Sequence, residues 1–357
     1  MTSAGDPSNA DRSPWLTPTR WIVRSPNPLG DACMAMPAVR ALKRARPGVH
    51  LTMVCRENLA PLWQACDVVD AVIPFAKGLS PFAVGRIIRG HGSFDAGLLL
   101  PNSFRSALEL RLGGVRRLAG FAGHQRSLLL RLAVPEIAPA APRHDAYRYL
   151  DLVRALGLPM GGDDELLAIP PAPTSIPADP GEIHLGLCPG AEYGNAKRYP
   201  VDRYAEAVRL LRERRPGVTV RVSIYGSPAE RGIGDDLAAL LAEPRVNRAG
   251  QTTIAGLVDE LRTCHLVATN DTGTMHLAAA LGVPTVAIFG STDPDLTAPL
   301  GEGHRVVREK ADCSPCFLRE CPVDYRCMLR IEPSRVTQAI ESILEAAATT
   351  APPAPHA

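Results

Sequence analysis

Residues 21–55 read WIVRSPNPLGDACMAMPAVRALKRARPGVHLTMVC. Residues 21–24 predict a strand, residues 32–45 repeat apolar positions at helical spacing, and residues 49–54 predict a second strand. A strand, a helix and a strand of these lengths form a βαβ unit, in which the two strands lie parallel in one sheet. This stretch therefore predicts an α/β fold.

The same alternation continues along the chain and stops once, at a proline-rich segment. Before that segment we expect helices at 59–65 and 81–89 and strands at 68–73 and 94–100. After it we expect strands at 184–187, 218–225, 265–268 and 285–289, and helices at 201–214, 229–241, 254–261, 273–281 and 333–346. Two Rossmann-like domains joined by a stiff linker explain this pattern, and ligands of such folds bind at the carboxyl ends of the strands.

The expected boundaries follow from composition. Residues 1–18 are predicted to be a disordered leader, 19–158 the N-terminal domain, 159–182 the linker, 183–346 the C-terminal domain and 347–357 a flexible tail.

Composition excludes several classes of protein. The chain has 357 residues, of which 46% are hydrophobic and 21% charged, so it has enough apolar side chains to build cores and is not disordered throughout. A net charge of +2 argues against a nucleic-acid binder. No apolar run reaches the length of a membrane helix, and the polar start of the chain lacks a signal sequence, so a cytoplasmic location is expected.

The first loop whose residues could take part in binding or catalysis is Ser25-Pro-Asn-Pro-Leu-Gly-Asp31, which follows the first predicted strand. Gly30 allows close approach of a ligand, and Asp31 lies where the helix dipole favours a carboxylate. Asp31 is either a helix cap or a general base at the mouth of a cleft.

The second loop, Pro189-Gly-Ala-Glu-Tyr-Gly-Asn-Ala-Lys-Arg-Tyr-Pro200, follows the first strand of the second domain. Lys197 and Arg198 are adjacent cations suited to phosphate. The alternative is an ordinary loop with solvated basic residues.

The third segment, Asn270-Asp-Thr-Gly-Thr-Met-His276, also links a strand to a helix. Asn270, Asp271 or Thr272 can cap this helix, and the amides of Gly273 and Thr274 then offer a seat for a diphosphate. His276 is either structural or a contact to the same anion.

The fourth segment is C-x2-C-x4-C-x5-C, formed by Cys313, Cys316, Cys321 and Cys327. Four thiolates can bind a structural zinc ion, although the usual site has two pairs with a longer insert; thiols without a metal are the alternative.

These segments, together with Gly290-Ser-Thr-Asp-Pro294, resemble glycosyltransferase family 9, the heptosyltransferases of the lipopolysaccharide inner core. The resemblance implies a GT-B fold of two Rossmann-like domains that face each other across a cleft. It also implies an inverting, metal-independent transfer from ADP-heptose to a lipid-anchored, anionic acceptor.

Matching positions imply a role for each residue. Asp31, beside Gly30, matches the base at the acceptor site, and Lys197 a phosphate-binding, catalytic lysine. The donor contacts implied by the resemblance are Arg198, Glu230, Asp271, Thr272, Gly273, Thr274 and His276. No cofactor is implied for catalysis. The alternatives are a catalytically silent sugar-nucleotide binding module, an epimerase, or a transferase that uses another nucleotide sugar.

A basic segment suggests a further contact. Six arginines crowd residues 105–131, whose only acidic residue is Glu109. They are Arg105, Arg111, Arg116, Arg117, Arg126 and Arg131. They are either solvated or form a face that binds the acceptor through Arg116 and Arg117 and holds the protein at the inner membrane.

Overall fold

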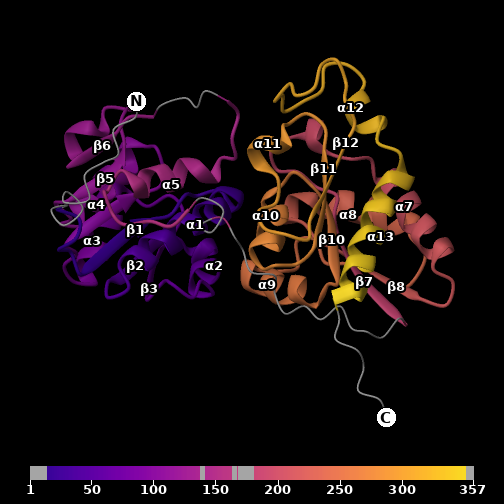
Figure 1. Cartoon of the computed structure of the whole chain (residues 1–357), viewed down its shortest axis with the longest axis horizontal. Coiled ribbons are helices and arrows are strands. Elements are labelled where there is room, and N and C mark those ends of the chain that lie inside the picture. Colours follow the sequence, from indigo (N-terminus) through magenta and orange to yellow (C-terminus); the bar gives the residue numbers. More distant parts are fainter. Residues whose placement is uncertain (1–13, 137–140, 163–166, 168–180, 351–357) are drawn as a thin grey trace, which may run out of the picture. The chain divides into compact units, whose positions relative to one another are not determined.

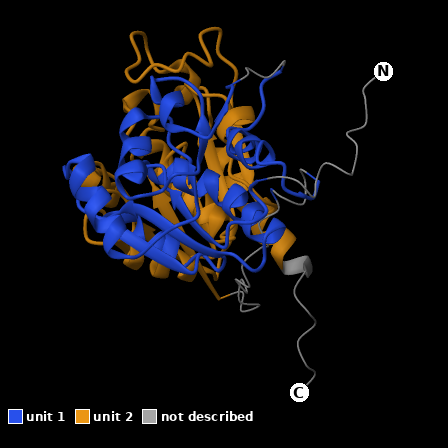
Figure 2. Cartoon of the chain, turned by 90° about the vertical axis from the view of Figure 1, so that its left-hand side faces the viewer, with its two compact units in different colours: residues 1–168 blue, residues 169–357 orange. Residues whose placement is uncertain are grey.

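A computed structural model of the chain describes residues 14–136, 141–162, 167 and 181–350. The chain divides into two compact units, residues 1–168 and 169–357 (Figure 2). Most of the predicted linker, residues 1–13 of the predicted leader and residues 351–357 of the predicted tail lie outside the described residues.

The first unit is built on a six-stranded parallel sheet (Figure 1). Its strands are β1 Arg20–Arg24, β2 His50–Arg56, β3 Ala71–Phe75, β4 Ala96–Leu99, β5 Leu118–Phe121 and β6 Leu132–Val134, in the order β3-β2-β1-β4-β5-β6. The chain reverses its direction of travel across the sheet between β1 and β4. In folds of this kind a ligand binds at that point, beyond the carboxyl ends of the strands.

Helices connect these strands. They are α1 Leu29–Ala45, α2 Ala60–Gln64, α3 Pro81–Gly90, α4 Phe104–Leu112 and α5 Ala146–Arg154, with short 3-10 turns at Glu57–Leu59 and Arg126–Leu129. The side chain of Ser80 accepts the amide of Ala83 at the start of α3, and Ser103 accepts the amide of Ser106 at the start of α4. These caps fix where the two helices begin.

The second unit repeats the plan. Its strands are β7 Glu182–Cys188, β8 Thr219–Ile224, β9 Arg245–Asn247, β10 Leu266–Asn270, β11 Thr285–Phe289 and β12 Arg305–Arg308, in the order β12-β11-β10-β7-β8-β9. All neighbouring pairs are parallel. The reversal falls between β10 and β7, so the loops that follow these two strands are the expected ligand loops.

The helices of this unit are α7 Val201–Arg214, α8 Arg231–Leu240, α9 Ile254–Thr263, α10 Gly273–Ala280, α11 Pro294–Thr297, α12 Arg326–Leu329 and α13 Pro333–Thr350. Short 3-10 turns lie at Asn195–Lys197 and Pro228–Glu230. From Met275 to Ala279 every residue of α10 is buried, because the helix is covered on all sides. No helix in the described part of the chain is both long and apolar enough to cross a bilayer.

The predicted α/β class and the two Rossmann-like sheets are confirmed, with local differences. Residues 66–69 form a turn, in which the Val69 amide donates to the Cys66 carbonyl, so the strand predicted at 68–73 is displaced to Ala71–Phe75. The last helix continues to Thr350, into the predicted tail. The short strands β5, β6, β9 and β12 and the helices α4 and α5 had no counterpart in the prediction.

Candidate functional site

In the second unit, the predicted donor residues lie together at the carboxyl edge of the sheet. Lys197 and Arg198 are in the loop after β7, and Glu230 follows β8. Asp271 to His276 follow β10. Parallel strands bring these ends to one edge, which explains why segments far apart in sequence meet here.

Asn270, at the end of β10, ties two of these loops together. Its fully buried amide nitrogen donates to the carbonyls of Pro189 and Gly190. Its oxygen accepts the amide of Tyr199 and the hydroxyl of Tyr204. The side chain therefore fixes both ends of the loop that carries Lys197, and does not serve as the predicted helix cap.

Lys197 forms an ion pair in this loop. Its ammonium lies 2.5 Å from a carboxylate oxygen of Asp271, and the two side chains are only 13% and 5% exposed. The same oxygen accepts the hydroxyl of Thr292 at 2.8 Å, from the loop after β11. Asp271 thus holds the cation at the start of α10.

The start of α10 offers unused donors. Thr272 is the N-cap residue but makes no side-chain cap bond, and its hydroxyl is buried without a partner in the described residues. The hydroxyl of Ser291 is in the same state. The first amides of a helix, here from Gly273 and Thr274, have no partner within the helix. His276 is buried in the first turn. A diphosphate would satisfy the hydroxyls of Thr272 and Ser291 and the first amides of the helix.

Glu230 borders the same loop and is half-buried. One of its oxygens accepts both the amide and the hydroxyl of Ser227, in a capping box. Its carboxyl group lies against Gly190, where a Cβ atom would approach a Glu230 oxygen to 2.2 Å. Glu230 therefore lies beside the loop that carries Lys197 and also has a structural role.

Arg198 turns toward its own loop. One guanidinium nitrogen donates to the Ala191 carbonyl at 3.4 Å, and its Nε atom is buried with no partner in the described residues.

In the first unit, Asp31 lies in the first turn of α1, two residues after the start of the helix at Leu29. The N-cap residue is Pro28, and no side chain caps this helix, so the alternative of a capping role for Asp31 is wrong. Burial raises the pKa of Asp31, and the carboxylate of Asp145 raises that pKa further, while Arg148 opposes this shift. Asp31 is a half-buried carboxylate with raised basicity.

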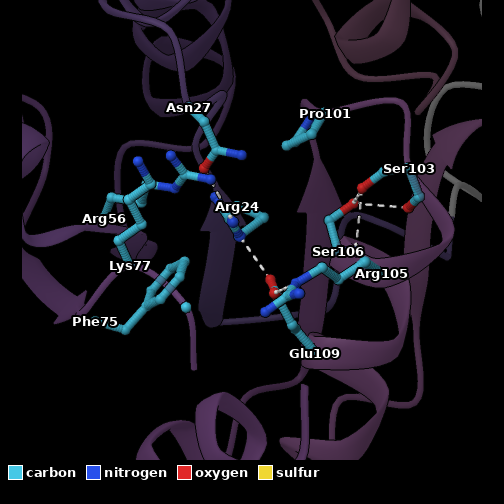
Figure 3. Close-up of a pocket in the computed structure, with 11 residues that line it drawn as sticks. Arg24, Asn27, Arg56, Phe75, Lys77, Pro101, Ser103, Arg105, Ser106 and Glu109 are labelled. Atoms are coloured by element: carbon cyan, nitrogen blue, oxygen red, sulfur yellow. Dashed lines mark hydrogen bonds and ion pairs between the residues drawn. The ribbon is translucent and has the colours of Figure 1, made fainter. Parts of the chain in front are cut away.

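A pocket of about 280 Å³ lies at the carboxyl edge of this sheet (Figure 3). Arg24 ends β1, Arg56 ends β2, and Pro101 follows β4. The pocket is therefore at the reversal point of the first sheet. The other lining residues are Asn27, Phe75, Lys77, Gly78, Ser103, Arg105, Ser106 and Glu109.

The charge of this pocket is positive. Its lining carries four cations and one carboxylate, that of Glu109. Glu109 is fully buried and accepts from Arg24 Nε at 2.9 Å and from Arg105 Nε at 3.1 Å. Arg24 also stacks over Phe75, with its guanidinium carbon 4.7 Å from the ring centroid. No ion pair within the described residues engages Arg56 or Lys77, so the pocket suits an anion.

The predicted basic face is dispersed. Arg126 is fully buried and donates to the carbonyls of Phe121 and Pro101, and Arg105 belongs to the pocket. Arg116 and Arg117 precede β5, at the amino edge of the sheet, because the carbonyl of Arg117 accepts the amide of Gly97. The structure therefore does not bring them together with Asp31, which follows the carboxyl end of β1.

The four cysteines of the 313–327 segment lie near one another: burial raises the pKa of Cys327, and Cys313, Cys316 and Cys321 raise it further. Cys313 is exposed, whereas Cys327 is buried in the core of the second unit. Among the residues that the structure describes, no group of three or more His, Cys, Asp or Glu side chains is arranged to hold a metal ion. The predicted zinc site is therefore not assembled.

Sequence reasoning missed the pocket of the first unit, although a signal was present. Cations stand at the carboxyl ends of its first three strands: Arg24 and Arg56 end β1 and β2, and Lys77 follows β3. It also missed the linking role of Asn270 and the contact of Thr292 with Asp271.

This chain is similar to known proteins over most of its length. The model of glycosyltransferase family 9 (heptosyltransferase) matches residues 82–326. Lipopolysaccharide heptosyltransferase 2 of Salmonella typhimurium is 30% identical over 90% of this chain and 98% of that protein. Lipooligosaccharide heptosyltransferase 2 of Haemophilus influenzae is 28% identical over 80% of this chain and 88% of that protein.

Solved structures match both units. That of ADP-heptose LPS heptosyltransferase II from E. coli has a TM-score of 0.74 and 26% identity, and the match covers 92% of this chain and 99% of that one. A family 9 glycosyl transferase from Veillonella parvula, at 20% identity, shares the fold with a TM-score of 0.75 over 94% and 99% of the two chains. The implied GT-B fold is confirmed.

Proposed function

The chain belongs to glycosyltransferase family 9, the heptosyltransferases, and on that premise we propose that it transfers a heptose from ADP-heptose to the inner core of lipopolysaccharide. The relatives named above are lipopolysaccharide and lipooligosaccharide heptosyltransferases, and they match this chain over most of their length. The transfer proceeds with inversion at the anomeric carbon and needs no cofactor.

The observation that carries this proposal is the Lys197–Asp271 pair at the start of α10. A cation, free helix amides and the unpaired hydroxyl of Thr272 at one sheet edge suit a nucleoside diphosphate. Arg198, Glu230 and His276 complete the proposed donor site. Negative charge grows on the diphosphate as ADP leaves, and groups already aimed there stabilise the transition state.

The pocket of the first unit supplies the acceptor side of the proposal. Inner-core acceptors carry negative charge, and the pocket has an excess of cations, of which Arg56 and Lys77 have no acidic partner in the described residues. An anionic group of the acceptor binds there, beside the turn that carries Gly30 and Asp31. Arg116 and Arg117, at the other edge of the sheet, have no part in this site. The acceptor is lipid-anchored, so the enzyme works peripherally on the cytoplasmic face of the inner membrane.

Asp31 is the proposed general base. The acceptor hydroxyl forms a bond to the anomeric carbon, the bond from that carbon to the diphosphate oxygen breaks, and the hydroxyl proton moves to the Asp31 carboxylate. A raised pKa makes this carboxylate a stronger base than an ordinary aspartate.

Replacing the two unpaired pocket cations tests the proposal. Arg56→Ala/Lys77→Ala should raise the acceptor KM at least about tenfold, because two charge contacts to an anion are lost. The dissociation constant for ADP-heptose should stay within about twofold. The matched control is Arg209→Ala, an exposed arginine paired with Glu206 and Glu213 in the other unit.

Two outcomes would contradict the proposal. An unchanged acceptor KM would show that the pocket does not bind the acceptor. Conversion of ADP-heptose to an isomer without any acceptor would identify an epimerase instead.

A further inference from the structure

The four-cysteine segment lies against the loop that carries Lys197. The Tyr193 hydroxyl donates to the Phe317 carbonyl at 2.8 Å, and the Ala196 amide donates to the Arg319 carbonyl at 3.1 Å. These bonds join two stretches of chain more than a hundred residues apart. The loop that carries Lys197 is therefore held by Phe317 and Arg319 as well as by Asn270.

Gly194 shows how close this contact is. Its φ of 157° lies in the region that favours glycine, and a Cβ atom there would come within 2.1 Å of the Arg319 carbonyl oxygen. No other residue fits between the two backbones without moving one of them.

The segment is anchored in turn to a second ligand loop. The amides of Cys316 and Phe317 both donate to the Ser291 carbonyl, at 3.0 and 2.8 Å. Ser291 precedes Thr292, which contacts Asp271. Residues 314–319 thus bridge the loop after β7, which carries Lys197, and the loop after β11, which carries the Asp271 contact Thr292.

Tyr193 is the side chain that links this bridge to the pair. The Lys197 ammonium lies 4.8 Å from the Tyr193 ring centroid, and the Arg319 guanidinium carbon lies 5.1 Å from it. A cation within about 6 Å of an aromatic face is attracted to it. The ring therefore limits where the Lys197 ammonium can lie.

We propose that Tyr193 is a positioning residue that fixes Lys197 for transfer, and that residues 314–319 serve as the strap that holds Tyr193 in place. This inference rests on the proposed function, in which Lys197 binds the diphosphate. The Tyr193 ring positions the Lys197 ammonium. The strap positions the ring, because its Phe317 carbonyl accepts the Tyr193 hydroxyl.

A double-mutant cycle tests the inference, because two residues that act through one another do not have independent effects. Tyr193→Leu should lower kcat/KM about 10- to 50-fold, mostly in kcat, and Tyr193→Phe should restore all but about threefold by keeping the ring. In a Lys197→Ala background, Tyr193→Leu should change kcat/KM less than about twofold. Tyr147→Phe, whose ring lies near Arg143 in the first unit, is the matched control.

Equal losses from Tyr193→Leu in both backgrounds would overturn the inference, since Tyr193 would then act independently of Lys197. Tyr193 is 40% exposed, so unchanged thermal unfolding is expected and separates positioning from loss of fold. Binding of ADP to the parent chain and to each variant is measured in parallel. If the parent chain neither binds ADP nor transfers heptose, the proposed function fails. If the parent chain does both and Tyr193→Leu has the same kcat/KM, only the inference about Tyr193 fails.

Discussion

Among the residues that the structure describes, the carboxylate of Asp31 makes no structural contact that would occupy it. Its carboxylate caps no helix and forms no ion pair or hydrogen bond within the described residues. Burial and the neighbouring Asp145 raise its pKa, which makes the ionised form a better proton acceptor. A carboxylate with these properties, on a strand-to-helix turn, suits the proposed role of general base.

Asp31→Asn keeps the shape of the side chain and removes the base. We expect kcat to fall by roughly 10²–10⁴, while the dissociation constant for ADP-heptose stays the same. Because folding raises the pKa of Asp31, ionisation of Asp31 at neutral pH destabilises the folded protein. The Asn variant lacks this charge and should unfold at an equal or slightly higher temperature. Near-parental turnover, or a large drop in unfolding temperature, would contradict the role as base.

The pH dependence of the parent enzyme follows from the same shift. Only ionised Asp31 accepts a proton, so kcat/KM should fall as the pH drops through the pKa of Asp31. Because that pKa is raised, the fall should occur at a higher pH than for an ordinary aspartate with a pKa of 3.8. The residual rate of Asp31→Asn, recorded over the same pH range, should lack this acid limb; an identical limb in both proteins would assign it to another group.

Lys197 should matter more to the transition state than to the ground state. We expect Lys197→Ala to lower kcat by roughly 10²–10³ and to raise the donor dissociation constant much less, because charge on the diphosphate grows as ADP leaves. The loss leaves Asp271 unpaired, so the comparison is repeated in an Asp271→Asn background. Equal losses in kcat and donor affinity would indicate uniform binding instead.

At the scale of elements, two loops depend on one buried amide. Asn270 makes four hydrogen bonds, to Pro189, Gly190, Tyr199 and Tyr204. A buried polar group left without its partner costs about 1–3 kcal/mol. Asn270 therefore supports both ends of the loop that carries Lys197.

Asn270→Ala should destabilise the second unit by about 3 kcal/mol or more and weaken ADP binding, because several buried groups lose their partner together. Denaturant unfolding measures the stability, and calorimetry measures the binding. Thr253→Ala is the control, since it removes one exposed helix cap from α9, worth about 1 kcal/mol, away from the loop. Equal costs for the two variants would show that the four bonds of Asn270 do not act together.

The elements that sequence predicted well are those with strong local patterns. The strand and helix at residues 20–45 and the buried strands around Lys197 and Asp271 are continuous apolar or helical runs, so their existence and the loops between them were predictable. The strands β5 and β6 have only four and three residues, too few to show a pattern. The pocket around Arg24 and Glu109 depends on residues 85 positions apart, a pairing that only the folded sheet creates.

At the scale of the whole molecule, the basic side chains are not one surface. Arg126 is buried, and Arg105 is exposed but belongs to the pocket. The other exposed arginines of this segment are Arg111, Arg116 and Arg131. Arg117 donates to the carbonyl of Pro14. Any attraction to an anionic membrane through this segment depends on those few side chains, at about 1 kcal/mol each near the surface.

Flotation with anionic vesicles tests that attraction. If the segment contributes, Arg116→Glu/Arg117→Glu should reduce the bound fraction several-fold at low salt and leave the donor dissociation constant unchanged. Charge reversal at Arg209, in the other unit, is the control. An unchanged bound fraction for Arg116→Glu/Arg117→Glu would show that these arginines are solvated and do not bind the membrane.

The central claim concerns what is transferred and to what. The most direct measurement is mass spectrometry of a purified inner-core acceptor after incubation with the chain and ADP-heptose, with the Asp31→Asn variant in parallel. The account predicts an acceptor heavier by one heptose, formed with release of ADP, and a strongly reduced yield with the variant. An acceptor that stays unmodified with the parent chain, or that gains heptose equally fast with Asp31→Asn, would contradict it.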